Sequence, residues 1–317
     1  MRIALGLEYD GSRFLGWQTQ PGGGTVQDTL EAALGTIAAE PVSVTCAGRT
    51  DRGVHALEQV VHFEVAAQRP ASAWVRGANA LLPESVAVQW AREVPADFHA
   101  RYSARARTYR YVLLNRAVRP AIAARHAGWF HAPLELAPMR AAARHLVGEH
   151  DFSAFRSAEC QAKTPVRTLH ALDIAQQGER FDFVLRANAF LHHMVRNVVG
   201  TLVYVGKGKH PPAWAREVLE SRERSRAAPT FAAEGLYLER VEYAAPGRRG
   251  RRAFRRRCHR AGVLSAQPAL PERRARARSA RRAAAVRAGG GPVREPRCGA
   301  GCAGHRPRAS GDAAVPR

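Results

Sequence analysis

The chain has 317 residues, of which 46% are hydrophobic and 24% charged, and its formal net charge at pH 7 is +22. This length is enough to bury the core of one large domain or two small ones, and no apolar run is long enough to cross a bilayer, so we expect no membrane partner. The five cysteines show no disulfide framework and the N-terminus reads as a strand rather than a signal region, which leads us to expect a cytoplasmic protein.

Residues 1–105 are predicted to alternate between strands and helices. A strand over residues 2–9 ends at the turn Asp10-Gly11, and Thr25 is a favourable N-cap for the helix that follows. The apolar residues of that helix fall on one face: Val26, Leu30, Ala33, Leu34 and Ile37. Further strands are expected over residues 42–46, 59–64 and 86–93, and a helix over residues 71–81.

A short loop between two of these strands carries the most informative residue. Asp51 lies between Gly48 and Gly53, with Arg49 and Arg52 on either side. Guanidiniums favour an ionised carboxylate and also bind phosphate, and catalytic groups are often found on loops held by a rigid sheet. The alternative is an ordinary turn in which Asp51 caps its own backbone.

The second half, residues 106–245, repeats this succession. We expect a strand over 108–114, a helix over 138–146, a hairpin over 169–187 that turns at Gly178, a helix over 190–204 and a closing strand over 236–243. Two such sets indicate an α+β fold with helices on one face of a largely antiparallel sheet. His192 and His193, adjacent in the expected helix, would point in different directions and would not share a metal ion.

Residues 246–317 have a different composition, rich in Arg, Ala, Gly and Pro. They contain twenty arginines and three acids, a net charge of +17, which leaves +5 of the total +22 for residues 1–245. Such a segment has too few apolar residues to offset the entropy of ordering, so disorder is predicted. It is either a non-specific RNA-binding arm or an extension without a selected role, and arginine without any lysine favours the second. Cys298, Cys302 and His305 lack a fourth ligand, so no zinc site is expected there.

Several stretches of residues 1–243 stand in a characteristic order. They are residues 4–12 (ALGLEYDGS), 16–18 (GWQ), 25–31 (TVQDTLE), 47–56 (AGRTDRGVHA), 97–104 (DFHARYSA), 107–111 (RTYRY), 148–152 (GEHDF), 188–197 (NAFLHHMVRN) and 233–238 (AEGLYL). This ordered set closely resembles the tRNA pseudouridine synthase A family. The tail after residue 245 lies outside the resemblance.

The resemblance implies an isomerase that converts uridine to pseudouridine at positions 38–40 of the tRNA anticodon stem-loop. It also implies a homodimer and a pseudouridine-synthase-like fold, with two related subdomains, residues 1–105 and 106–245, around a central RNA-binding cleft. The reaction moves the ribose C1′ bond from uracil N1 to C5 without redox change, so neither a metal nor a cofactor is expected.

Roles for Asp51, Arg196 and Tyr109 follow from the same resemblance, whereas those for Arg49 and Leu236 are inferred from the residues themselves. Asp51 would be the catalytic nucleophile, and Arg196 would pair with it and orient it; the alternative for Arg196 is an ordinary surface arginine. Tyr109 would stack on the target base, or else face the core. Arg49 would hold a phosphate or fill the space left by the flipped base, unless it makes a loop salt bridge. Leu236 would pack under the base, although core packing explains it equally well.

Two other enzyme classes lack their motifs in this sequence. No GxxxxGK[ST] phosphate loop is present, which disfavours nucleotide hydrolysis, and no HxE…PCxxC pattern is present, which disfavours zinc-dependent deamination. The remaining alternative is a non-catalytic RNA-binding or RNA-chaperone protein that acts through the arginine-rich tail.

Overall fold

A computed structural model describes residues 1–244 of the chain. The strands of this part form one sheet in the order β4-β1-β3-β10-β5-β9-β8-β7, with β2 paired to β3 and β6 to β5. The strands are β1 (Arg2–Tyr9), β2 (Thr45–Cys46), β3 (His55–Glu64), β4 (Val86–Val94), β5 (Ala104–Asn115), β6 (Gly128–Phe130), β7 (Gly148–Asp151), β8 (Val166–Gln177), β9 (Arg180–Ala187) and β10 (Leu236–Tyr243). Only the pairs β10–β3 and β5–β6 are parallel within the described residues.

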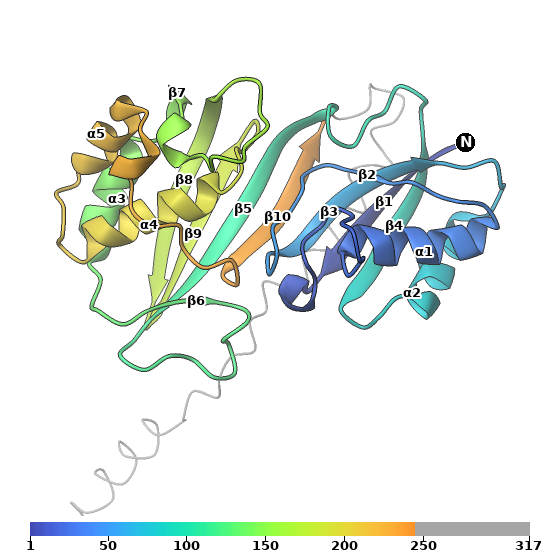
Figure 1. The fold of residues 1–317 in the computed structure, drawn as a ribbon, viewed down its shortest axis with the longest axis horizontal. Coiled ribbons are helices and arrows are strands. Elements are labelled where there is room, and N and C mark those ends of the chain that lie inside the picture. Colours follow the sequence, from blue (N-terminus) through green and yellow to red (C-terminus); the bar gives the residue numbers. More distant parts are fainter. Residues whose placement is uncertain (245–317) are drawn as a thin grey trace, which may run out of the picture. The chain divides into compact units, whose positions relative to one another are not determined.

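The helices belong to the two halves of this sheet (Figure 1). They are α1 (Val26–Ala38), α2 (Ala78–Leu81), α3 (Leu136–Arg144), α4 (Met194–Gly206) and α5 (Trp214–Ser221). The first two accompany β4-β1-β3, whereas the other three accompany β5-β9-β8-β7. The predicted α+β class with a largely antiparallel sheet is confirmed.

Strand β10 connects the two halves. Although it is last in the chain, it lies between β3 and β5, where Tyr237 pairs with His55 in parallel and Leu238 pairs with Tyr109 antiparallel. The sheet is therefore continuous across the chain, and the proposed division near residue 105 falls at the start of β5. That division and the central cleft stay predictions.

Most predicted elements are present, with two corrections. The helix expected over residues 71–81 is confirmed, and its middle is a π-helical turn, Ala73–Gly77, that leads into α2. The strand expected over residues 42–46 is only β2, and the helix expected from residue 190 begins at Met194 because His193 has a positive φ of 63°. By contrast, Thr25 caps α1 as predicted, since its hydroxyl accepts a hydrogen bond from the Asp28 backbone N–H.

One continuous set of buried side chains fills both halves. Its largest members include Trp17, Phe63 and Trp74 in the first half and Phe152, Phe155 and Phe181 in the second. A core of this kind holds the backbone of the connecting loops in place.

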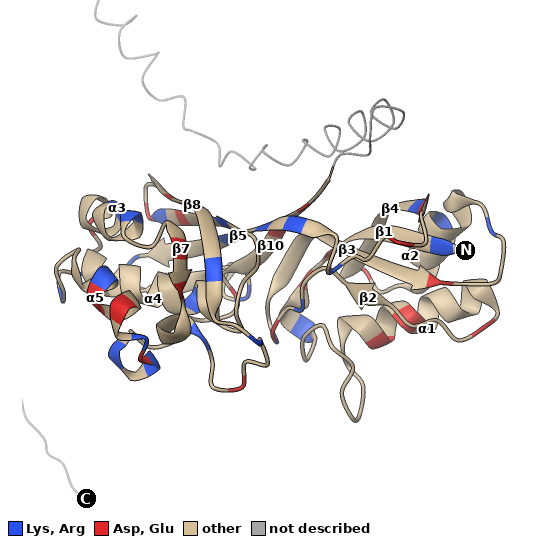
Figure 2. Ribbon diagram, turned by 90° about the horizontal axis from the view of Figure 1, so that it is seen from above, with Lys and Arg blue, Asp and Glu red and all other residues tan. Residues whose placement is uncertain are grey.

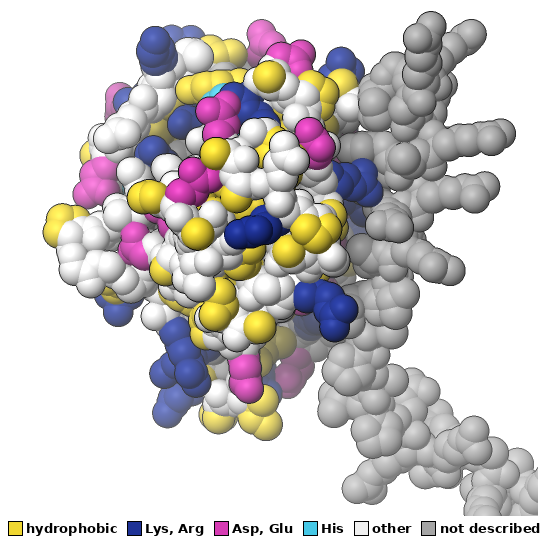
Figure 3. All heavy atoms as spheres, turned by 90° about the vertical axis from the view of Figure 1, so that its right-hand side faces the viewer, with side chains coloured by type: hydrophobic (Ala, Val, Ile, Leu, Met, Phe, Trp, Pro, Cys, Tyr) yellow, Lys and Arg dark blue, Asp and Glu magenta, His cyan; other side chains and the backbone are white. Residues whose placement is uncertain are grey.

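Charges are distributed over the described surface. Figure 2 shows basic and acidic positions along both halves, including basic positions on the central strands. In Figure 3, which faces the end that carries α1, acidic and basic side chains alternate with apolar ones rather than gathering by sign. No helix within residues 1–244 is both long enough and apolar enough to cross a membrane. The disorder and the absence of a zinc site predicted for residues 246–317 lie outside the described residues.

Candidate active site

The loop that carries Asp51 is held from beneath by buried polar side chains. Gln59, which is fully buried on β3, donates from Nε2 to the Gly48 carbonyl at 2.6 Å. Thr50 is joined through its hydroxyl to the Tyr9 hydroxyl at 2.8 Å, and its carbonyl accepts from the Trp17 N–H at 2.9 Å. These bonds fix the backbone immediately before the carboxylate.

Two glycines shape the same loop. Gly16 has a φ of +110°, and a Cβ at this position would lie 3.1 Å from the Thr50 carbonyl oxygen and 3.3 Å from the Asp51 carbonyl carbon. Gly53 has a φ of +80°, and the turn is closed by a hydrogen bond from the Val54 N–H to the Asp51 carbonyl at 3.1 Å. A left-handed backbone and a close approach are both suited to glycine.

Arg107 on β5 links this loop to distant parts of the chain. Its buried guanidinium donates to the carbonyls of Ala47 at 3.0 Å, Asn188 at 3.0 Å and Arg101 at 2.6 Å. Carbonyl dipoles rather than a carboxylate therefore satisfy this charge. The start of the Asp51 loop is thereby tied to the segment that precedes α4.

The Asp51 carboxylate meets three nitrogen donors. Arg196 donates from Nη1 to Oδ2 at 3.0 Å, His192 Nε2 lies 3.2 Å from Oδ1, and His193 Nε2 lies 3.4 Å from Oδ2. Burial alone would raise the pKa of Asp51, but the hydrogen bond from His192 and the charges of His193, His192 and Arg196 bring that pKa below its usual value. The carboxylate is thus ionised at neutral pH, while 24% of its side chain remains exposed.

Arg196 is fixed at both ends of its side chain. It lies in the first turn of α4, and its Nε donates to the Phe231 carbonyl at 2.7 Å while Nη1 reaches Asp51. The Phe231 N–H donates in return to the Arg196 carbonyl at 3.3 Å. The predicted pairing of Arg196 with Asp51 is present in this geometry, and the alternative of an ordinary surface arginine does not fit it.

The prediction that His192 and His193 diverge is wrong. Both residues precede α4, and the left-handed φ of His193 brings the two rings to 4.1 Å, with both Nε2 atoms facing one carboxylate. A positive φ is uncommon for a residue other than glycine and is often found at functional sites. One ligand atom each from Asp51, His192 and His193 lies within 4.8 Å of the other two, which is also close enough for metal ligands.

The two histidines differ in their tendency to hold a proton. The hydrogen bond with Asp51 raises the pKa of His192, whereas burial lowers the pKa of His193. Helical periodicity, which places neighbours on different faces, concealed this pair. The signal that could have revealed it is the short spacing from each histidine to Arg196.

Tyr109 lies on β5, close enough to Asp51 for the carboxylate charge to act on its phenol group. Its ring is 8% exposed and meets Phe190 edge-to-face at a centroid distance of 5.0 Å. The hydroxyl lies 3.5 Å from the position that a Cβ on Gly48 would take. Burial, followed by the negative charge of Asp51, raises the pKa of Tyr109, so the phenol is neutral.

The last two candidates occupy different environments. Arg49 is exposed on the loop, two residues before Asp51, and makes no ion pair with the residues of the described part, so the salt-bridge alternative is not observed. Leu236 begins β10, pairs with Tyr111 and is 6% exposed within the core. Core packing accounts for Leu236, and its contact with a base stays a prediction.

This geometry can be compared with known proteins. A family profile described as "tRNA pseudouridine synthase" matches residues 7–103 and 142–244. The chain belongs to the tRNA pseudouridine synthase family. The matched segments contain Asp51 and Arg196, whereas Tyr109 lies in the interval between them. Family membership confirms an isomerase that converts uridine to pseudouridine in tRNA.

Individual relatives carry the same description. The tRNA pseudouridine synthase A of Dechloromonas aromatica (strain RCB) is 58% identical over 243 residues, which cover 77% of this chain and 93% of that protein. Its counterpart in Bordetella petrii is 60% identical over 244 residues, 76% of this chain and 91% of that protein. A solved structure titled "Crystal Structure of a Cbf5-Nop10-Gar1 Complex" covers 74% of this chain and 48% of that chain, at 10% identity and a TM-score of 0.34, a likeness too weak to support a conclusion.

Proposed function

We propose that this synthase modifies positions 38–40 of the tRNA anticodon stem-loop and that Asp51 is its catalytic nucleophile. The observation that supports this role is the ionised, partly exposed Asp51 carboxylate, directed by Arg196 and two histidines and adjacent to Tyr109. We also propose that the enzyme is a cytoplasmic homodimer, in line with the family resemblance.

The reaction requires a carboxylate at this point. The bond from ribose C1′ to uracil N1 breaks and a bond to C5 forms, while C5 loses its proton and N1 gains one. Positive charge develops on the sugar as the base departs, and Asp51 can stabilise this charge or add to C1′, as carboxylates do in glycoside chemistry. Addition of Asp51 to the pyrimidine ring and removal of the C2′ proton are alternative routes.

The Asp51 carboxylate would be kept ionised and held in a fixed orientation by Arg196, His192 and His193. Oδ2 is directed by Arg196 and Oδ1 by His192, so the carboxylate group is restrained at both oxygens. Fixed donors of this kind need no reorganisation when the sugar charge develops. We assign all three as positioning residues because they act through Asp51.

Tyr109 and Arg49 would contact the RNA. A neutral phenol ring offers a flat surface for an extruded base, and base stacking of this kind contributes about 1–3 kcal/mol per base. The exposed guanidinium of Arg49, two residues from Asp51, would hold a phosphate or fill the space left by the flipped base. Leu236 would support the base from below.

Transcripts with a single uridine test the proposed positions. Three tRNA transcripts would each carry a single uridine in the anticodon arm, at position 38, 39 or 40. The other uridines of that arm would be replaced by cytidine, with base pairing preserved. Pseudouridine in all three, and none in a transcript with uridine only in another arm, is the expected result. Modification of the control arm alone would overturn the assignment to positions 38–40.

A further inference from the structure

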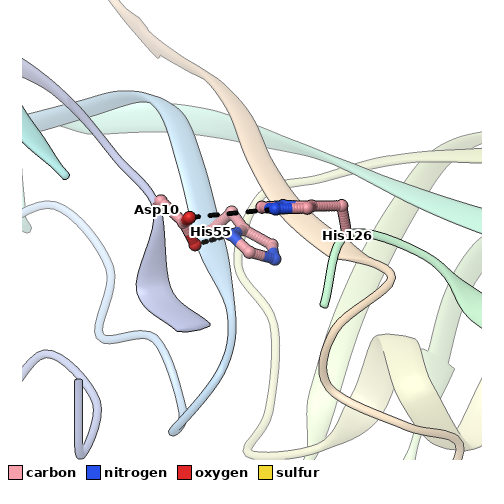
Figure 4. A group of neighbouring side chains, drawn as sticks. All are labelled: Asp10, His55 and His126. Carbon is pink, nitrogen blue, oxygen red and sulfur yellow. Dashed lines mark ion pairs between the residues drawn. The ribbon is translucent and has the colours of Figure 1, made fainter. Parts of the chain in front are cut away.

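A second group of ligand-type side chains lies outside the Asp51 site. Asp10 follows β1, His55 begins β3, and His126 lies in the segment between β5 and β6 (Figure 4). These three come from parts of the chain that are far apart in sequence, and their side chains converge. His55 is four residues after Asp51, but no step proposed for the isomerisation uses it.

The distances within this group suit a small ion. Asp10 Oδ1 lies 3.1 Å from His55 Nδ1, and Asp10 Oδ2 lies 3.9 Å from His126 Nε2. One ligand atom from each residue lies within 4.8 Å of the others. Bonds of about 2.0–2.2 Å to a tetrahedral ion place ligand atoms roughly 3.3–3.6 Å apart, so small side-chain movements would complete the geometry.

The surroundings of His55 determine which nitrogen carries its proton. Nε2 lies 2.9 Å from the Arg125 carbonyl and 3.2 Å from the Glu234 carbonyl, and carbonyls only accept hydrogen bonds. Nε2 must therefore be the protonated nitrogen, and Nδ1, which accepts a hydrogen bond from the Gly11 N–H at 3.2 Å, keeps its lone pair. Histidines that bind metals commonly donate their other N–H to a backbone carbonyl in this way.

Two acceptors consequently face each other. The Nδ1 lone pair and the Asp10 carboxylate oxygen are 3.1 Å apart. Each has a backbone donor of its own, the Gly11 N–H for Nδ1 at 3.2 Å and the Ser12 N–H for Oδ1 at 2.9 Å. The repulsion between the two acceptors remains, and either a proton on Nδ1 or a cation relieves it.

The group is accessible and its surroundings are acidic. It borders a cavity of about 250 Å³ that is also lined by Glu8, Glu84 and Tyr237. The side chains of His126 and Asp10 are 48% and 39% exposed, whereas His55 is buried beneath the Tyr237 ring, which stacks on it at 4.7 Å. Carboxylates around a small cavity raise the local concentration of cations.

We propose that Asp10, His55 and His126 form a binding site for a divalent transition-metal ion of the zinc class. Two imidazoles and one carboxylate are ligands that zinc, cobalt and nickel accept, and a water molecule would take the fourth position. The ion would join the end of β1, the start of β3 and the segment before β6. It would stabilise the region where the first half of the chain meets the second, and this role is independent of the proposed site of tRNA modification.

Cobalt binding to the full chain tests this proposal. The protein is stripped with a chelator, dialysed and titrated with Co²⁺ while the visible d–d absorption is recorded, and Zn²⁺ is then added in competition. His126→Ala removes an exposed ligand, and Asp10→Asn removes the charge while keeping an oxygen that can cap Ser12. His131→Ala is a matched exposed-histidine control, and His192→Gln removes a ligand of the other group. Cysteines and histidines of residues 245–317 contribute the same background to every variant.

The proposal predicts that the parent, His131→Ala and His192→Gln each bind one molar equivalent of Co²⁺ that Zn²⁺ displaces. Affinity for this equivalent should fall at least tenfold in His126→Ala and Asp10→Asn, and Zn²⁺ should raise the melting temperature of the parent but not of these two variants. Equal cobalt affinity and stoichiometry in all five proteins would overturn it and leave a proton-bridged ion pair. Loss of the cobalt equivalent only in His192→Gln would also overturn it.

Discussion

Arg196 Nη1 lies 3.0 Å from Asp51 Oδ2, although 145 residues separate the two in sequence. The contact joins the two segments of the chain that match the family, one on the loop before β3 and the other in the first turn of α4. Because Phe231 holds the same guanidinium through Nε, the direction of the Asp51 carboxylate depends on the packing of the second half.

Replacing Arg196 by lysine should reduce turnover more than substrate affinity. A single ammonium cannot reach both the Phe231 carbonyl and Asp51 as the fork of the guanidinium does. We expect kcat and kcat/KM to fall together by about tenfold to a hundredfold, which corresponds to about 1.4–2.7 kcal/mol, while KM changes little. Arg216→Lys is the matched control, because Arg216 makes only an exposed pair with Glu220. Equal rates in the two lysine variants would contradict the positioning role.

The pair of His192 and Asp51 should make stability depend on pH. Asp51 raises the pKa of His192 above its ordinary value of 6.5, so this contribution is fully present below 6.5 and is lost as the pH rises through the folded-state pKa. At the acid end it disappears as Asp51 is protonated below its own lowered pKa. The unfolding free energy of the parent minus that of His192→Gln should therefore be largest between these limits. Denaturant titrations at several pH values measure it, and a difference independent of pH would refute the charge interaction.

His192→Gln should also move the acid limb of activity. Without the imidazolium, one of the causes that lower the pKa of Asp51 is removed, so that pKa rises and turnover is lost at a higher pH. A single-turnover pH profile of the parent and the variant measures the shift. Superimposable profiles would show that His192 does not act through the charge of Asp51.

Two substitutions of Tyr109 should distinguish a role of its ring in stacking from a role of its hydroxyl group. Residues 1–244 offer its hydroxyl no hydrogen bond, so Tyr109→Phe keeps the ring and should retain near-parental tRNA affinity and stability. Tyr109→Ala removes a buried ring, which costs roughly 3–5 kcal/mol of stability, and also loses stacking of about 1–3 kcal/mol. Binding is measured by filter retention at a temperature where the alanine variant is folded. Parental affinity and rate in that folded variant would remove the stacking role.

Gly16→Ala should impair catalysis through the loop backbone. The alanine has an unfavourable φ, at about 1–2 kcal/mol, and its Cβ would press on the Thr50 carbonyl beside Asp51. Gly178→Ala provides the control, since it also has a positive φ but nothing lies within 4 Å of its Cβ. Both variants should lose stability, but only Gly16→Ala should lose turnover. Equal turnover in both would show that the loop tolerates displacement.

Local sequence predicted much of the fold because local rules govern it. The cap at Thr25, the turn at Gly178 and the strand before Asp10 are each decided by neighbouring residues, and the structure shows all three. The insertion of β10 between β3 and β5 was not predicted, because a pairing of the last strand with the third depends on tertiary packing.

The site was predicted unevenly for the same reason. Asp51 stood out through its glycines and arginines, whereas Arg196 and Tyr109 were found only by the family resemblance. His193 was misjudged because its positive φ, which breaks the helical periodicity, depends on the contacts around it. Arg107 was overlooked because a strand arginine gives no sign of being buried against carbonyls.

Release of tritium from C5-labelled uridine in tRNA tests the central claim most directly. The full chain and its Asp51→Asn variant, which preserves the size of the side chain, are compared at equal tRNA occupancy. We predict that the parent releases tritium and forms pseudouridine, while the variant binds tRNA with similar affinity and releases none. Release at the parental rate by Asp51→Asn would contradict the assignment of Asp51 as the catalytic residue.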